Sequence, residues 1–186
     1  MSESRIATVL YEDKQQRGPN GFPLHTLVLA MLSDETGIEI HKLSGLVDGI
    51  PRNGVDKAIA DLKRTSSRAG SGRLILLLDQ DRISEHVFRR KGASEDEIRE
   101  ALVKLSDAPS QVSIYFLYPN LEGLLRTIQE CGAPDPAPTA KNHSARDIYL
   151  KHTAYRWRHT VSDCLRRQQS GAGSLVEELR SLISLR

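Results

Sequence analysis

Acidic side chains follow three apolar segments of this 186-residue chain, and they are the residue types best suited to chemistry. Glu12 comes after the first such segment, and Glu122 comes shortly after the last. Asp79 and Asp81 follow the most apolar one. Crowded carboxylates repel one another unless a cation neutralises them. Mg²⁺ (or Mn²⁺) prefers oxygen ligands and, once bound, polarises a phosphoryl oxygen or activates water. These residues therefore predict a divalent metal site that acts on a phosphate group of a substrate.

The segments before these acids are rich in strand formers, which is typical of strands covered on both faces. The predicted strands cover residues 6–11, 38–43, 73–78 and 112–117. Apolar residues at helical spacing predict helices over residues 24–33, 55–65, 94–105 and 121–131. The third of these helices begins with Ser94 and Glu97 in capping-box spacing. Residues 14–23 are a predicted loop, and residues 66–72 a predicted flexible turn.

This alternation predicts an α/β fold with an open, mostly parallel, Rossmann-like sheet of about four strands and helices on both faces. Ligands of such sheets bind outside the carboxyl ends of the strands, because loops converge there and helix amino termini point at the site. We therefore expect the four acidic residues at one edge of the sheet.

Three stretches divide the chain. Residues 1–131 form the predicted α/β domain, residues 132–144 a proline-rich linker, and residues 145–186 a C-terminal helical extension. The extension has helical patterns over residues 145–168 and 174–185. Two arrangements of these helices stay open, packing on the sheet or reaching towards a partner.

The net charge of +2 neither demands nor excludes a nucleic-acid partner. Basic residues accumulate late in the chain, with aromatic residues among them, which fits either a solvated helix or a phosphate-contacting surface. Arg82, beside the acidic pair, is suited to a phosphate contact or to a local salt bridge with Asp79 or Asp81. The candidate nucleic-acid contacts are Arg82, Lys151, Arg156 and Arg158.

The remaining residue types favour a reduced, cytoplasmic protein. Cys131 and Cys164 show neither short spacing nor a metal-ligand pattern, so we expect no disulfide framework. No signal peptide is indicated, no apolar run is long enough to span a membrane, and the six histidines show no zinc-site spacing. A phosphate-binding Gly-x-x-x-x-Gly-Lys-Ser/Thr motif is absent from the sequence, so any ATPase that the protein serves is a separate chain.

Each acidic residue also has a purely structural interpretation. Asp79 has the residue type of a helix cap, and Glu122 that of a first-turn acid stabilised by the helix dipole. The Asp-x-Asp pair after five apolar residues is more specific, and Glu12 at a second strand end strengthens the combination.

Together these motifs resemble a known family. A strand ending in Glu12 (Thr-Val-Leu-Tyr-Glu) and a later apolar strand ending in Asp79-Gln-Asp81 resemble the TOPRIM domain of topoisomerases, primases and overcoming-lysogenization-defect nucleases. Small stand-alone TOPRIM-like proteins of bacterial mobile and defence loci are more similar still, since their fourth strand is followed by an element like Asn120-Leu121-Glu122. The resemblance covers residues 6–131.

The resemblance implies that Glu12 acts as general acid or base while Asp79 and Asp81 hold the metal during cleavage or joining of a nucleic-acid backbone. The family pattern has glycine directly after the first glutamate, whereas this chain has Asp13 and a long Gly/Pro loop behind it. This departure implies either altered substrate access or lost catalysis.

Three functions follow from these residues. The first is a metal-dependent nuclease or nuclease-like subunit that acts on DNA or RNA, in a bacterial defence or repair complex. The second is a non-catalytic binding or regulatory subunit that keeps the TOPRIM-like fold. The third is a nucleotide-sugar transferase, which also uses Asp-x-Asp after an apolar strand, but the chain is too short for its acceptor-binding half.

Overall fold

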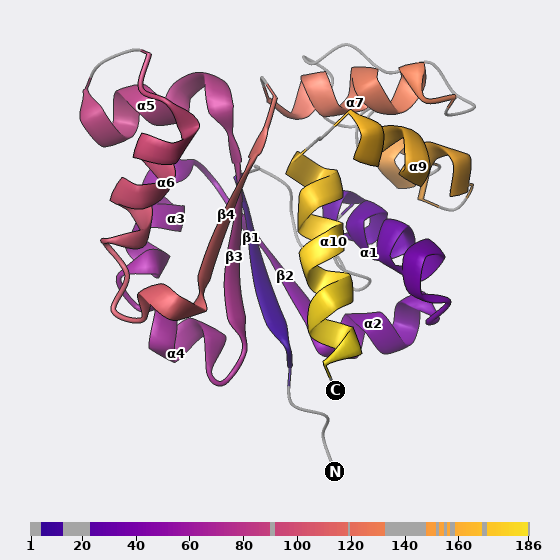
Figure 1. Ribbon diagram of the computed structural model, residues 1–186, viewed down its shortest axis with the longest axis horizontal. Helices are drawn as coiled ribbons and strands as arrows, with labels where there is room; N and C mark the ends of the chain where they lie inside the picture. Colours follow the sequence, from indigo (N-terminus) through magenta and orange to yellow (C-terminus); the bar gives the residue numbers. More distant parts are fainter. Residues whose placement is uncertain are drawn as a thin grey trace.

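A four-stranded, all-parallel sheet forms the centre of the protein, with helices on both faces (Figure 1). The structure is a computed structural model that describes residues 5–12, 23–89, 92–118, 120–132, 148–151, 153, 154, 156, 159–168 and 171–185, with residues 82, 159 and 160 described by backbone alone. The strand order is β2-β1-β3-β4. The strands are β1 (Ala7–Glu12), β2 (Val47–Arg52), β3 (Arg73–Asp79) and β4 (Val112–Leu117). The predicted α/β class with an open parallel sheet is confirmed.

Helices cover the sheet in two layers (Figure 1). One layer holds α3 (Val55–Leu62), α4 (Thr65–Ala69), α5 (Gln80–Phe88) and α6 (Glu95–Val103). The opposite layer holds α1 (Pro23–Thr36), α2 (Ile40–Leu46), α7 (Leu121–Glu130), α9 (His159–Arg167) and α10 (Gly171–Ser184). A short 3₁₀ helix, η1 (Pro109–Gln111), precedes β4.

The two layers make two hydrophobic cores, one on each face of the sheet. Successive side chains of a strand point to opposite faces, so Ile75 and Leu77 of β3 enter the core with α1 and α10. Leu74, Leu76 and Leu78 enter the other core, with α3 and α6. This two-sided burial explains why β3 is a continuous apolar run instead of an alternating one.

The second strand lies later in the chain than predicted. Residues 38–43 were predicted as a strand, but residues 40–46 form α2, and β2 follows at Val47–Arg52. The prediction was wrong because β2 contains Gly49 and Pro51, which conceal its strand character. An edge strand tolerates such residues, and β2 is at the edge of this sheet. Residues 66–72 were predicted as a flexible turn, but the first of them belong to the helix α4, which covers Thr65–Ala69.

Helix caps are formed where the sequence predicts them. In the capping box of α6, the backbone N–H of Glu97 donates to Oγ of Ser94 at 3.2 Å, and the backbone N–H of Ser94 donates to Oε2 of Glu97 at 2.8 Å. At α7, the backbone N–H of Gly123 donates to Oδ1 of Asn120 at 3.3 Å. These hydrogen bonds therefore determine where α6 and α7 begin in the chain.

The C-terminal helices pack on the sheet, which settles the arrangement that the sequence left open. Leu175, Val176 and Leu179 of α10 are buried in the same core as β1 and α1. Ser162 of α9 donates from Oγ to Oδ2 of Asp34 on α1 at 2.8 Å. The hydrophobic core therefore extends across the predicted boundary at residue 145. Residues 133–147, which hold most of the predicted linker, lie outside the described residues.

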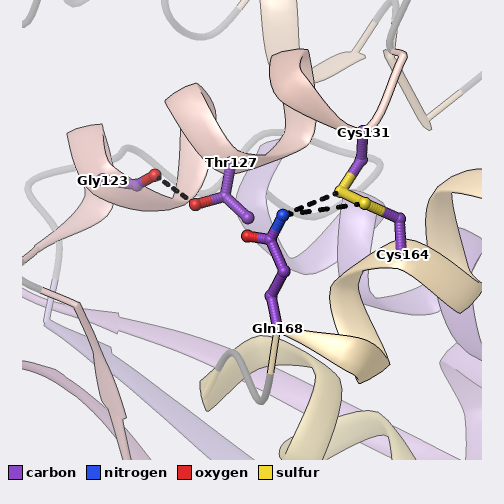
Figure 2. Close-up of a disulfide and its surroundings, with 5 residues drawn as sticks. All are labelled: Gly123, Thr127, Cys131, Cys164 and Gln168. Carbon is purple, nitrogen blue, oxygen red and sulfur yellow. Dashed lines mark hydrogen bonds between the residues drawn. A yellow bond between two sulfur atoms is a disulfide. The ribbon is translucent and has the colours of Figure 1, made fainter.

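Cys131 and Cys164 form a disulfide, so the prediction of two reduced cysteines is wrong for this structure. The two residues lie 33 positions apart in sequence, but α9 folds back against the end of α7 and brings their Cα atoms to 5.6 Å. Figure 2 shows the bond between the end of α7 and α9. A separation of 33 positions has no local pattern from which this pairing was predictable.

The described helices include none that combines the length and the hydrophobicity needed to cross a bilayer.

The open edge of β4 is covered by other elements of the fold. Arg99 of α6 donates from Nε to the carbonyl of Ile114 at 3.2 Å. Gly171, the first residue of α10, lies so close to β4 that an added Cβ would be 1.9 Å from the carbonyl oxygen of Phe116. Covering the edge in this way prevents it from pairing with another chain.

Substitution Gly171→Ala tests this close approach. The new methyl group overlaps backbone atoms that cannot move aside like a flexible side chain, so we expect the free energy of unfolding to fall by about 1–3 kcal/mol. Gly45→Ala in α2 is the matched control, because an added Cβ there meets no atom within 4 Å. We expect the control to be neutral or stabilising by up to about 1 kcal/mol. Urea denaturation measures the free energy of unfolding of both variants. Equal values would contradict the close packing of Gly171 against Phe116.

Candidate functional site at the carboxyl ends of the strands

The parallel register brings two acidic strand ends to the same edge of the sheet. Tyr11 of β1 pairs with Leu77 of β3, which places Glu12 and Asp79 at the ends of neighbouring strands. Asp79 in turn pairs with Leu117, the last residue of β4. We call the cluster of Glu12, Asp79, Asp81 and Asn120 the carboxylate rim.

Glu12 contacts the second acidic motif directly. The backbone N–H of Asp79 donates to Oε2 of Glu12 at 3.2 Å. Since the Glu12 side chain is only partly exposed, this contact orders its carboxylate. Two motifs 67 residues apart in the chain therefore meet at one edge.

Asp79 contacts the beginning of α7 and does not cap α5. It is the residue before α5, but its side chain makes no capping hydrogen bond to that helix. Instead its Oδ1 accepts the backbone N–H of Leu121, the first residue of α7, at 3.1 Å. Asp79 therefore does not cap the helix that follows it, and its carboxylate links β3 to the beginning of α7.

Asp81 is held by the residue that caps α7. Nδ2 of Asn120 donates to Oδ2 of Asp81 at 3.0 Å, while Oδ1 of the same amide accepts the N–H of Gly123. Asn120 was not among the predicted site residues. The sequence pointed to it only as the first residue of the family-like element Asn120-Leu121-Glu122.

Glu122 is separate from these contacts. It lies in the first turn of α7 and is partly exposed. Within the described residues it makes no hydrogen bond or ion pair to the other three acids. This position matches the interpretation in which the helix dipole stabilises a first-turn acid.

As arranged here, the predicted ligands do not come together as a group of three. Across the described ranges, no group of three or more His, Cys, Asp or Glu side chains lies close enough to hold an ion. The carboxylates of Asp79 and Asp81 accept protein N–H groups from the beginning of α7. The rim in this state is a hydrogen-bonded joint between β1, β3, α5 and α7.

The predicted phosphate contacts are only partly described. Lys151 and Arg156 are exposed, as a phosphate-contacting surface requires. Arg158 and the side chain of Arg82 lie outside the described residues, as does Asp13. A further cation at this edge, Arg52, escaped sequence reasoning. It pairs with Glu12 in the sheet register, and its guanidinium forms an ion pair with Asp61 at 2.5 Å.

A groove lies beside the rim along β4. Its volume is about 490 Å³, and its walls come from β4, α6, α7 and the beginning of α10. Tyr118, which follows β4 and lines this groove, is 68% exposed. Arg99 lines the groove as well, with its guanidinium carbon 5.5 Å from the centre of the Phe116 ring. The groove thus offers an exposed aromatic ring near the last strand end, while Arg99 is paired with Glu95, which also lines the groove, and with Asp96.

Comparison with known proteins gives no match to a family model, to a curated protein or to a solved structure.

Replacing Asn120 tests whether one amide holds both the cap and Asp81. In Asn120→Ala both hydrogen bonds are lost, so we expect a loss of about 1–2 kcal/mol in the free energy of unfolding. Combining this variant with Asp81→Ala should give less than the sum of the two single losses, because both remove the same contact. Strictly additive losses in urea denaturation would show that Asn120 and Asp81 do not interact.

Proposed function

We propose that this chain is a TOPRIM-like, metal-dependent nuclease or nuclease-like subunit that acts on the phosphodiester backbone of nucleic acid. The observation that carries the proposal is the contact between Glu12 and the backbone N–H of Asp79 at 3.2 Å, which joins the two motifs on which the family resemblance rests. In this proposal Mg²⁺ or Mn²⁺ supplies the charge that lets a phosphate approach the rim.

The surroundings of the rim support a phosphate as ligand. The amino termini of α5 and α7 lie at this edge, and helix amino termini favour anions. The exposed ring of Tyr118 in the neighbouring groove is suited to stacking on a base. Lys151 and Arg156, with Arg82 and Arg158, remain the proposed backbone contacts. A partner chain would supply any ATPase, and we propose a cytoplasmic defence or repair complex as the setting.

The same rim supports a second candidate, a non-catalytic binding or regulatory subunit. The observation in its favour is that Asp79 and Asp81 already accept N–H groups from Leu121 and Asn120. A site with three carboxylate ligands would require these side chains to rearrange, since they do not lie together as such a group. In the non-catalytic candidate the acids serve only to fix α7 on the sheet.

Cleavage assays separate the two candidates. Single-stranded and double-stranded DNA and RNA are incubated with the full chain in Mg²⁺, in Mn²⁺ and in EDTA. A nuclease should cleave only with metal, and Glu12→Gln, Asp79→Asn and Asp81→Asn should each reduce the rate by about 10²–10⁴-fold, as expected for loss of an acid–base or charge-stabilising group. Glu100→Gln on α6 is the matched control, since this carboxylate is 69% exposed and pairs with Lys104 on its own helix.

Each outcome decides between the candidates. Metal-dependent cleavage that persists in all three rim variants excludes the rim as the catalytic site. Complete inactivity, together with a melting temperature that Mn²⁺ leaves unchanged, favours the non-catalytic subunit. If the protein cleaves nucleic acid, Glu122→Gln tests whether Glu122 binds the metal. Loss of a metal ligand would raise the Mn²⁺ concentration required for cleavage, whereas loss of a first-turn helix acid would not.

A further inference from the structure

The disulfide fixes one end of the helix whose other end holds the rim. Cys131 directly follows α7, and Cys164 lies in α9 (Figure 2). At the beginning of α7, Leu121 and Asn120 donate to Asp79 and Asp81. A helix of ten residues is about 15 Å long and moves as one rod, so a constraint at its carboxyl end bears on the donors at its amino end.

Helix α9 is anchored independently of this bond. Leu165 is fully buried, and Oγ of Ser162 donates to Asp34 on α1. Glu35 on α1, whose side chain is only 7% exposed, accepts ion pairs from Arg166 of α9 and from Arg180 of α10. The disulfide therefore ties α7 to a helix that is already fixed to α1.

Without the bond, α7 keeps its apolar contacts and its hydrogen bonds to Asp79 and Asp81. Leu124, Leu125 and Ile128 pack in the core with α1 and α10. These contacts suffice to keep the helix docked, but they leave its carboxyl end without a covalent link to α9. Breaking the bond should therefore loosen α7 locally without unfolding the sheet.

The surroundings of the sulfur atoms suit reversible exchange. Cys131 and Cys164 are both half-buried and not enclosed in the core, as attack by a small thiol on the folded protein requires. Nε2 of Gln168 lies 3.9 Å from Sγ of Cys131 and 3.8 Å from Sγ of Cys164 (Figure 2). Arg167 is three positions after Cys164 on the same helix, the spacing of neighbouring side chains. An N–H donor and a cation both stabilise the thiolate that leaves during exchange.

We propose that Cys131 and Cys164 are a thiol–disulfide exchange site for a dithiol reductant, and that their redox state sets how firmly α7 holds the carboxylate rim. One reductant thiolate attacks a protein sulfur, and the other protein sulfur leaves as a thiolate. The second reductant thiolate then releases the first protein sulfur. Overall the protein gains two electrons and two protons, and the dithiol becomes a disulfide. The inference holds whether or not the rim is catalytic.

Hydrogen exchange measured by mass spectrometry tests this link on the full chain, without metal or nucleic acid. After reduction with dithiothreitol, amides at the beginning of α7 should exchange several-fold faster, while those of β3 keep their rate. The double variant Cys131→Ser/Cys164→Ser should behave like the reduced protein and ignore the reductant.

Three results would overturn the inference. Alkylation of both cysteines in oxidised, non-denatured protein would show that the bond does not form. Equal exchange of α7 in both redox states would show that the bond does not reach the rim. Equal acceleration in α7 and β3 would show general destabilisation instead of a local link. Because no cleavage is measured, failure here is distinct from failure of the nuclease proposal.

Discussion

The parallel pairing of β1 with β3 is the constraint on which the rest of this structure depends. Both strands are buried on both faces, so their register is fixed by two cores at once. That register puts Glu12 beside the backbone N–H of Asp79. A slip by one residue would move the Glu12 side chain to the other face of the sheet and separate the two motifs. The rim is thus a consequence of core packing.

The rim also shows how hydrogen-bond donors can hold several negative charges at one sheet edge. Each acid has a donor of its own: the N–H of Asp79 for Glu12, the N–H of Leu121 for Asp79, and the amide of Asn120 for Asp81. Hydrogen bonds to a charged acceptor are stronger than neutral ones, so three of them offset much of the repulsion. The same donors orient α7 on the sheet. Contacts that stabilise the fold therefore also hold the side chains of the candidate site in place.

Much of the fold was predictable because burial leaves a strong pattern. The apolar run of β3, the capping box at Ser94 and the acids at strand ends were all visible in the sequence. Edge strand β2 was not, because its residues need to satisfy only one neighbouring strand and include Gly49 and Pro51. Its glycine has a tertiary reason, since an added Cβ would lie 2.3 Å from the ring of His25. Contacts between distant elements leave no local pattern, and this also explains the missed disulfide.

For the site, the sequence identified which acids lie at the edge but not what they contact. Glu12 and Asp79 meet as expected, whereas the contact of Asn120 with Asp81 emerged only from the structure. The central claim is that this rim exchanges its protein donors for a divalent ion. A crystal structure of the protein soaked in Mn²⁺, measured at the manganese absorption edge, tests it most directly. The account predicts an anomalous peak between Glu12 and Asp79, with the Leu121 contact broken. A rim without such a peak, and with all three hydrogen bonds intact, would contradict it.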